Sequence, residues 1–133
     1  MTDDPVERMV RYRLEQAEEA LSDAKILAAN NAGRNSIVNR AYYAMFYAVM
    51  ALAERKRFAS SKHKGTLAFF DKEFVMTGIF LKELSKSLHK AYDLRLKADY
   101  RPVVRVDDET VKSVMADAES FVREISLYLT GAS

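Results

Sequence analysis

The fold of this chain is decided by Ser36-Ile37-Val38-Asn39-Arg40-Ala41-Tyr42-Tyr43-Ala44-Met45-Phe46, which opens its most apolar segment. The uninterrupted apolar run covers thirteen residues, 41–53, well short of the roughly 20 needed to span a bilayer. Alanines recur at 41, 44, 48, 51 and 53 between large aromatic rings, so neighbouring helices can approach closely. We therefore expect a helix over about 36–58 that is buried on most sides.

Four further helices are predicted around this segment, over about 5–30, 62–78, 81–100 and 107–130. Apolar residues recur every three or four positions in them. Asp4-Pro5 and Asp107-Asp108-Glu109 are start signals, whereas Asn30-Asn31-Ala32-Gly33, Thr77-Gly78 and Arg101-Pro102 are stop signals. Residues 103–106 are expected to be extended. The pattern predicts an all-α fold, an antiparallel up-down bundle of four to five helices in one domain over 1–133.

The composition excludes several classes of protein. With 49% apolar and 30% charged residues the chain is an ordinary globular protein. It has no cysteine, so it has no disulfide, zinc-thiolate site or thiol nucleophile. The start of the chain, Thr2-Asp3-Asp4-Pro5, is acidic and is followed by no apolar signal segment. We expect a cytoplasmic protein with no membrane segment.

Charge is distributed unevenly along the chain. Residues 1–24 hold seven acids and three bases, residues 107–133 hold six and two, and residues 33–106 hold fifteen bases and six acids. The basic middle is one candidate for a face that attracts phosphate. The alternative is that the acidic ends pair with the basic middle inside the fold. Separately, the helix over 36–58 is apolar almost all round, which favours a homodimer.

Four blocks of sequence resemble a known family. The run Asn39-Arg40-Ala41-Tyr42-Tyr43-Ala44-Met45-Phe46-Tyr47-Ala48 is similar to the signature of small prokaryotic HEPN-domain proteins. Later blocks of the same family are matched, in order, by Lys62-His63-Lys64-Gly65, by Phe74-Val75-Met76-Thr77-Gly78 and by Arg95-Leu96-Lys97-Ala98-Asp99-Tyr100.

The resemblance implies a HEPN-like bundle, commonly dimeric and often encoded beside a minimal nucleotidyltransferase as a toxin and antitoxin pair. Active members are metal-independent endoribonucleases whose motif is an arginine, four to six residues, and a histidine. Carried over, Arg95 takes the arginine position, and Tyr100 stands where histidine is expected. Leu96 also departs from the polar residue usual after the arginine.

Metal-free RNA cleavage needs a general base, a proton donor and positive charge at the phosphate. Arg95 supplies the charge. The phenol of Tyr100, with an ordinary pKa of about 10, would cost about 4 kcal/mol as a base at neutral pH, but it is serviceable as a proton donor.

Each of the two histidines has a structural interpretation and a functional one. We expect His63 in the loop that enters the third helix, where it caps a helix or bonds a carbonyl, with catalysis as the alternative. His89 lies six residues before Arg95, nearly two turns away, so one subunit cannot easily bring both to one phosphate, whereas a partner subunit could.

The remaining polar candidates also keep two interpretations. Arg40 either pairs with an acid on a neighbouring helix or joins Asn39 and Arg95 in a cleft for nucleotide or RNA. Arg95 with Asp99 is an i,i+4 pair, which is either part of that site or a surface salt bridge. Three tyrosines of the same helix are expected in core and dimer packing rather than in base stacking, namely Tyr42, Tyr43 and Tyr47.

The sequence has no motif typical of other kinds of chemistry. There is no Gly-rich phosphate loop, no metal-ligand spacing and no Glu-x-x-His pair, so we expect no metal and no cofactor. Two functions remain open. The chain is either a toxin-like ribonuclease that acts at a dimer interface, or a noncatalytic subunit that binds a nucleotide or docks a nucleotidyltransferase.

Overall fold

The computed structural model describes residues 4–100 and 106–131, apart from the side chain of Tyr100. The described residues form α-helices and a short π-helical turn, with no strand among them. The all-α fold is therefore confirmed. In chain order the elements are α1 (Pro5–Ala29), α2 (Arg34–Lys56), α3 (His63–Phe70), the π-helical turn η1 (Asp71–Val75), α4 (Lys82–Tyr100) and α5 (Asp108–Thr130).

Several helix ends lie at the residues that sequence chemistry favours. The Asp4 carboxylate accepts a hydrogen bond from the amide of Val6, and Asp107 accepts one from the amide of Thr110. Both satisfy donors that the first turn of a helix leaves unpaired. Gly131 ends α5 in the left-handed region at φ 71°, a conformation that glycine adopts without a Cβ penalty.

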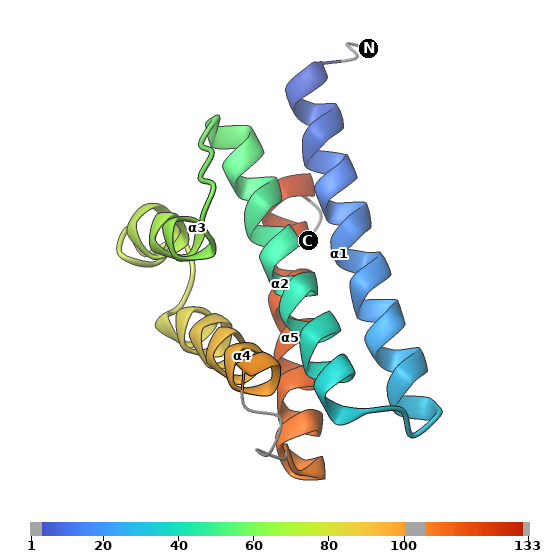
Figure 1. Ribbon diagram of the computed structural model, residues 1–133. Helices are drawn as coiled ribbons and strands as arrows, with labels where there is room; N and C mark the ends of the chain where they lie inside the picture. Colours follow the sequence, from blue (N-terminus) through green and yellow to red (C-terminus); the bar gives the residue numbers. More distant parts are fainter. Residues whose placement is uncertain (1–3, 101–105, 132–133) are drawn as a thin grey trace.

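Three long helices form the body of the molecule (Figure 1). α1 and α2 are antiparallel, and an ion pair of 2.6 Å joins Glu7 at the start of α1 to Arg55 near the end of α2. α5 runs in the same direction as α2, because Arg34 and Asp108, the first residues of these helices, pair at 2.9 Å. α3 and α4 lie together on one side of α2.

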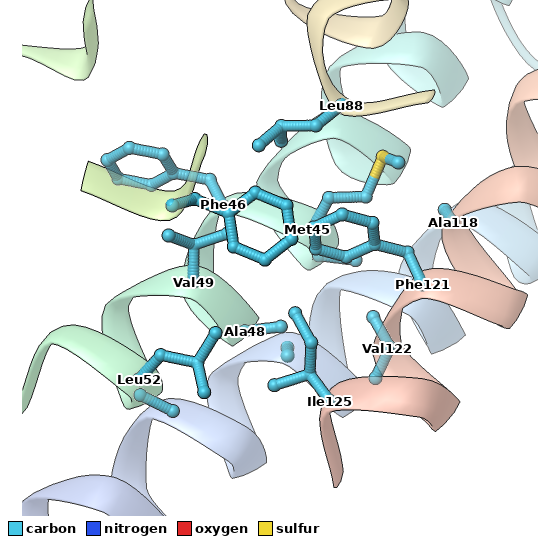
Figure 2. Close-up of a cluster of buried hydrophobic side chains, with 14 of the residues drawn as sticks. Met45, Phe46, Ala48, Val49, Leu52, Leu88, Ala118, Phe121, Val122 and Ile125 are labelled. Carbon is cyan, nitrogen blue, oxygen red and sulfur yellow. The ribbon is translucent and has the colours of Figure 1, made fainter. Parts of the chain in front are cut away.

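The core is centred on α2, which buries twelve of its residues. Its five alanines are at most 6% exposed, so the close helix approach expected from them is found. Figure 2 shows Met45, Phe46 and Val49 of α2 packed against Phe121 and Ile125 of α5, with Leu88 of α4 above them. Burial of this apolar surface is the main stabilising contribution to such a fold.

The third predicted helix is not uniform. We expected one helix ending at Thr77-Gly78, but α3 changes into a π-helical turn at Asp71. The Asp71 carboxylate accepts a hydrogen bond of 2.6 Å from Ser85 and pairs with His89 at 2.7 Å, both on α4. The altered backbone therefore coincides with a polar connection to the next helix. Gly78 follows at φ 82° and ends the segment, as its position predicted.

The charge asymmetry is partly neutralised inside the fold, and the alternative of a face that attracts phosphate stays a prediction. The acids Glu7 and Asp108 pair with Arg55 and Arg34, so acidic ends do neutralise part of the basic middle. Four exposed lysines of α4 have no ion pair within the described residues. They share one face of the helix by their spacing, and they are Lys82, Lys86, Lys90 and Lys97. The residues expected to be extended, 103–106, lie outside the described part except for Val106, which is buried.

Candidate functional site

Arg95 lies on the face of α4 that turns toward α2. Its side chain is only 15% exposed, and Nη1 donates a hydrogen bond of 3.1 Å to the hydroxyl of Tyr43. The guanidinium carbon lies 5.3 Å from the ring centroid of Tyr42 and 5.5 Å from that of Tyr43, both within cation–π range. Two tyrosines that were expected in the core therefore form the walls around this arginine.

The charge of Arg95 is incompletely matched. Asp99 forms the predicted i,i+4 pair at 3.7 Å, but its carboxylate is 45% exposed while the arginine is largely buried. The pair thus joins a largely buried arginine to a half-exposed carboxylate, and its role in a site stays a prediction. The Nε atom of Arg95 is buried and has no hydrogen-bond partner among the described residues. Because Nε is enclosed, an anion would reach Arg95 at the exposed part of its guanidinium, where the incompletely paired charge favours binding.

Arg40 brings a second cation to the same tyrosine. Its guanidinium carbon lies 5.2 Å from the ring centroid of Tyr43, and its Nε and Nη2 donate to Asn39 Oδ1 at 3.1 and 2.9 Å. No carboxylate of the described residues pairs with it, so the ion pair considered for Arg40 is not found. Glu19 and Asp23 of α1 line the same hollow of about 240 Å³ as Arg40, at longer range. Arg40 and Arg95 therefore share the ring of Tyr43.

His63 lies beside Arg40, Tyr42, Tyr43 and Arg95, which its position in the sequence did not indicate; these five residues are called the Arg95 cluster below. It is the first residue of α3, and its Nδ1 makes a hydrogen bond of 2.7 Å with the hydroxyl of Tyr42. Its ring stacks on Phe46 at 4.2 Å and meets Tyr43 edge-on at 5.7 Å. We expected a capping or carbonyl contact for His63, and that expectation was wrong. Its hydrogen-bond partner is a buried tyrosine that also faces Arg95.

Burial sets the protonation states of this pair. It lowers the pKa of His63 below its ordinary value, and the charge of Arg95 lowers it further. Burial also raises the pKa of Tyr42 far above its ordinary value, and the nearby Arg95 offsets only part of that rise. Both effects disfavour the charged form of the group concerned. At neutral pH the hydrogen bond therefore joins a neutral imidazole to a neutral phenol.

Two other candidates stand apart from the cluster. Tyr100 is the last residue of α4, and its side chain lies outside the described part of the structure, so its role stays a prediction. His89 is held by Asp71 at the π-helical turn and connects α4 to that turn. Its position six residues from Arg95, on another face of α4, matches the separation expected from the sequence.

The cluster is suited to binding an anion next to a neutral imidazole. Within the described ranges, no group of three or more His, Asp or Glu side chains is arranged to hold a metal ion. None of the helices there is long and apolar enough to cross a membrane. The fold and the site together define a helical-bundle protein with a cationic, aromatic-walled site on its central helix.

Comparison with known proteins identifies the family. The HEPN domain matches residues 10–128, and the chain belongs to the HEPN domain family. It is similar to a UPF0332 protein of Thermotoga maritima, with 42% identity over 119 residues, or 90% of this chain and 89% of the relative.

Two relatives from Methanocaldococcus jannaschii carry a toxin name. "Putative toxin MJ0605" is 37% identical over 116 residues, covering 87% of this chain and 85% of the relative. "Putative toxin MJ0142" is 32% identical over 122 residues, covering 92% and 82%. Two relatives of this chain within the HEPN family are thus named as putative toxins.

Proposed function

We propose that this protein is the toxin of a toxin and antitoxin pair, and that it is a metal-independent endoribonuclease. In this proposal Arg95 binds the scissile phosphate, Tyr100 donates a proton to the leaving oxygen, and the partner protein is a minimal nucleotidyltransferase. The observation that carries the proposal is the incomplete pairing of Arg95, which is 15% exposed and retains a buried donor without a partner.

The energetics of Arg95 favour a ligand role over a structural one. Burying a charge is costly unless it is paired and hydrogen-bonded, and an apolar side chain of similar size often stabilises a fold as well or better. Asp99 is half exposed and 3.7 Å away, so its attraction offsets only part of the free energy lost by burying the arginine charge. An incoming phosphate would supply the missing negative charge and accept charge-assisted hydrogen bonds. Arg40, hydrogen-bonded to Asn39, contacts the same Tyr43 ring as Arg95, so in this proposal both residues contact an adjacent phosphate or base.

RNA is the substrate class that the surface charge favours. The four lysines along α4 lie on the face opposite Arg95, so they do not line the site itself. Their field still attracts a polyanion and raises its association rate at low salt. A single mononucleotide would gain much less from charges spread over several helical turns.

A homodimer would complete the site. Arg40, Tyr43, Tyr47 and Met50 are only partly buried, and their spacing places them on one stripe of α2. Because Tyr43 also contacts Arg95, a second subunit on this stripe would bring two arginine sites toward one symmetry axis. The sequence expectation of dimer packing through α2 is therefore part of this proposal.

A noncatalytic role is the second candidate, and one observation favours it. Tyr100 occupies the position where active relatives carry a histidine, and a phenol is a poor base at neutral pH. In that case the cluster would bind a nucleotide, or α2 would dock the nucleotidyltransferase, without cleavage. The phosphate contact to Arg95 would be the same.

Cleavage of a mixed-sequence RNA in EDTA tests the proposal. We expect the wild type to cut and Arg95→Ala to lose at least about 100-fold of the rate, because a preorganised charge at the phosphate is removed. The matched control is Arg34→Ala. Arg34 is an exposed arginine at the first position of α2, outside the Arg95 cluster, and it pairs with Asp108. Light scattering and circular dichroism must show folded dimers in every case. Equal cleavage by the wild type and by Arg95→Ala would overturn the proposal. A wild type that binds a nucleotide but does not cleave RNA would favour the second candidate.

A further inference from the structure

The cluster contains a group able to act as a base, although the family motif lacks its histidine. Three kinds of side chain near Arg95 could take a proton. Asp99 is engaged by Arg95 itself, and burial raises the pKa of Tyr42 so that its phenolate is inaccessible. The imidazole of His63 is neutral at pH 7 and keeps one nitrogen available. Its contacts determine which nitrogen that is.

The orientation of His63 is fixed by its neighbours. Nδ1 is held by the Tyr42 hydroxyl, and the ring is stacked against Phe46 with an interplanar angle of 11°. Nε2 makes no hydrogen bond to any described residue. His63 is half-buried, and its Nε2 is not among the fully buried side-chain atoms of the described residues that lack a partner. The nitrogen left to act is therefore the one that Tyr42 does not occupy.

The backbone around His63 also favours an anion. His63 is the first residue of α3, whose start has no side-chain cap, so amide donors of its first turn remain available. The preceding loop passes close to this turn, and a Cβ on Gly65 would overlap the side chain of Ser60. The charged and titratable groups that face His63 are Tyr42 and Tyr43 from α2 and Tyr92 and Arg95 from α4.

We propose that His63 is the general base of this site, held in position by Tyr42, and that it removes the proton from the ribose 2′-hydroxyl next to the phosphate bound by Arg95. This inference rests on the proposed ribonuclease function. It assigns the missing histidine of the motif to α3, 32 residues before Arg95 in the chain, rather than to α4.

The proton balance of the step is complete. His63 Nε2 takes the 2′-hydroxyl proton, the 2′-oxygen forms a bond to phosphorus, and the bond from phosphorus to the 5′-oxygen breaks. The leaving oxygen takes a proton from Tyr100 or from water, and the imidazolium returns its proton to that donor through solvent. The products are a 2′,3′-cyclic phosphate and a 5′-hydroxyl. Nδ1–H can donate to the Tyr42 hydroxyl oxygen before and after the transfer, so that hydrogen bond survives the step.

The nearby cation makes the base dependent on substrate. Without a ligand, the Arg95 charge disfavours the imidazolium. A phosphate bound at Arg95 would offset that charge and make proton uptake by His63 easier. His63 is thus neutral before RNA binds and becomes a stronger base when the phosphate is in place.

Cleavage rates between pH 5 and 9 test this role. We expect His63→Ala to lose about 100-fold or more, the range usual for a positioned acid or base. Added imidazole should restore part of that loss, which it would not do for a purely structural residue. Tyr42→Phe should lose less of the cleavage rate than His63→Ala, because Tyr42 only positions the base. It should also shift the acid limb of the pH profile. His89→Ala is the matched control and should cut like the wild type, since His89 pairs with Asp71 outside the cluster.

The outcomes separate the two proposals. If Arg95→Ala is inert while His63→Ala cuts at the wild-type rate and pH profile, the His63 role is overturned and the proposed function stands. If Arg95→Ala cuts normally, or the wild type is inert, the proposed function fails and the His63 role fails with it. Should His63→Ala not fold, NMR titration of His63 in the wild type decides. A pKa that rises on binding 5′-AMP supports the role, and a pKa unmoved by bound 5′-AMP overturns it.

Discussion

Two clusters built on the same helix contrast with each other. One is the apolar cluster, the group of side chains around Phe121 and Ile125 that Figure 2 labels, all of them hydrocarbon or thioether. The other, the Arg95 cluster, holds a largely buried guanidinium, phenols and a half-buried imidazole, with one buried donor unpaired. Phe46 belongs to both, because it packs in the core and stacks on His63. The difference indicates that α2 is divided between a side optimised for stability and a side that retains unsatisfied polar groups.

The largest effect is expected from breaking the apolar cluster. Phe121 is 1% exposed, and Phe121→Ala should lower the free energy of unfolding by about 3–5 kcal/mol, because it removes buried surface and leaves a cavity. Urea denaturation followed by circular dichroism measures this. Leu81→Ala is the control, since Leu81 is 71% exposed and should change stability little. A loss below about 1 kcal/mol for Phe121→Ala would contradict the assigned core.

The opposite result is expected in the Arg95 cluster. Arg95→Met fills similar space without a charge, so it should leave the free energy of unfolding unchanged or raise it by about 1–2 kcal/mol. The same denaturation experiment measures it, and RNA cleavage should be lost at the same time. A strongly destabilised Arg95→Met protein would mean that the arginine holds the fold together rather than serving a ligand.

A pH-dependent contribution is expected from His63. Its pKa is lowered in the folded protein, so the unfolded chain binds more protons below the ordinary imidazole pKa of about 6.5. The contribution of His63 to the free energy of unfolding is therefore fully present above that pKa, and it is lost as the pH falls through and below it. His63→Gln should weaken the loss of stability between about pH 6.5 and 5, measured by thermal unfolding at several pH values. An identical pH dependence in both proteins would contradict the shift.

The smallest effect is expected at an exposed ion pair. Lys25 and Glu119 join α1 to α5 at 3.4 Å, and their side chains are 51% and 52% exposed. Lys25→Met should change the free energy of unfolding by less than about 1 kcal/mol, because water and salt screen such pairs. Unfolding at low and high salt checks this. A larger, salt-independent change would show that the stem of Lys25 contributes through packing.

Local signals in the sequence predicted most of the fold. Asp4-Pro5, Gly78 and Asp107 mark helix ends that the structure has, since caps and left-handed turns depend on only a few neighbouring residues. The π-helical turn was not predicted, because nothing in residues 71–75 distinguishes it from ordinary helix. Its Asp71 contacts depend on how α4 packs against it.

The candidate site was predicted only in part for the same reason. Arg95 with Asp99 follows from i,i+4 spacing, and Arg40 with Asn39 are chain neighbours. The contact of His63 with Tyr42 joins residues 21 positions apart on different helices, and no local pattern encodes it. Tyr42 was correctly expected to be buried, but burial alone does not say that its hydroxyl holds a histidine.

The π-helical turn has a consequence for how this chain can vary in length. A turn of this kind is equivalent to one extra residue accommodated within a helix. Deleting one residue between Asp71 and Val75 would therefore be absorbed as ordinary α-helix, and the residues on either side would keep nearly the same faces. The change would fall on the turn itself, where Asp71 contacts Ser85 and His89. Relatives without these three polar residues are the ones in which a gap should fall at this turn.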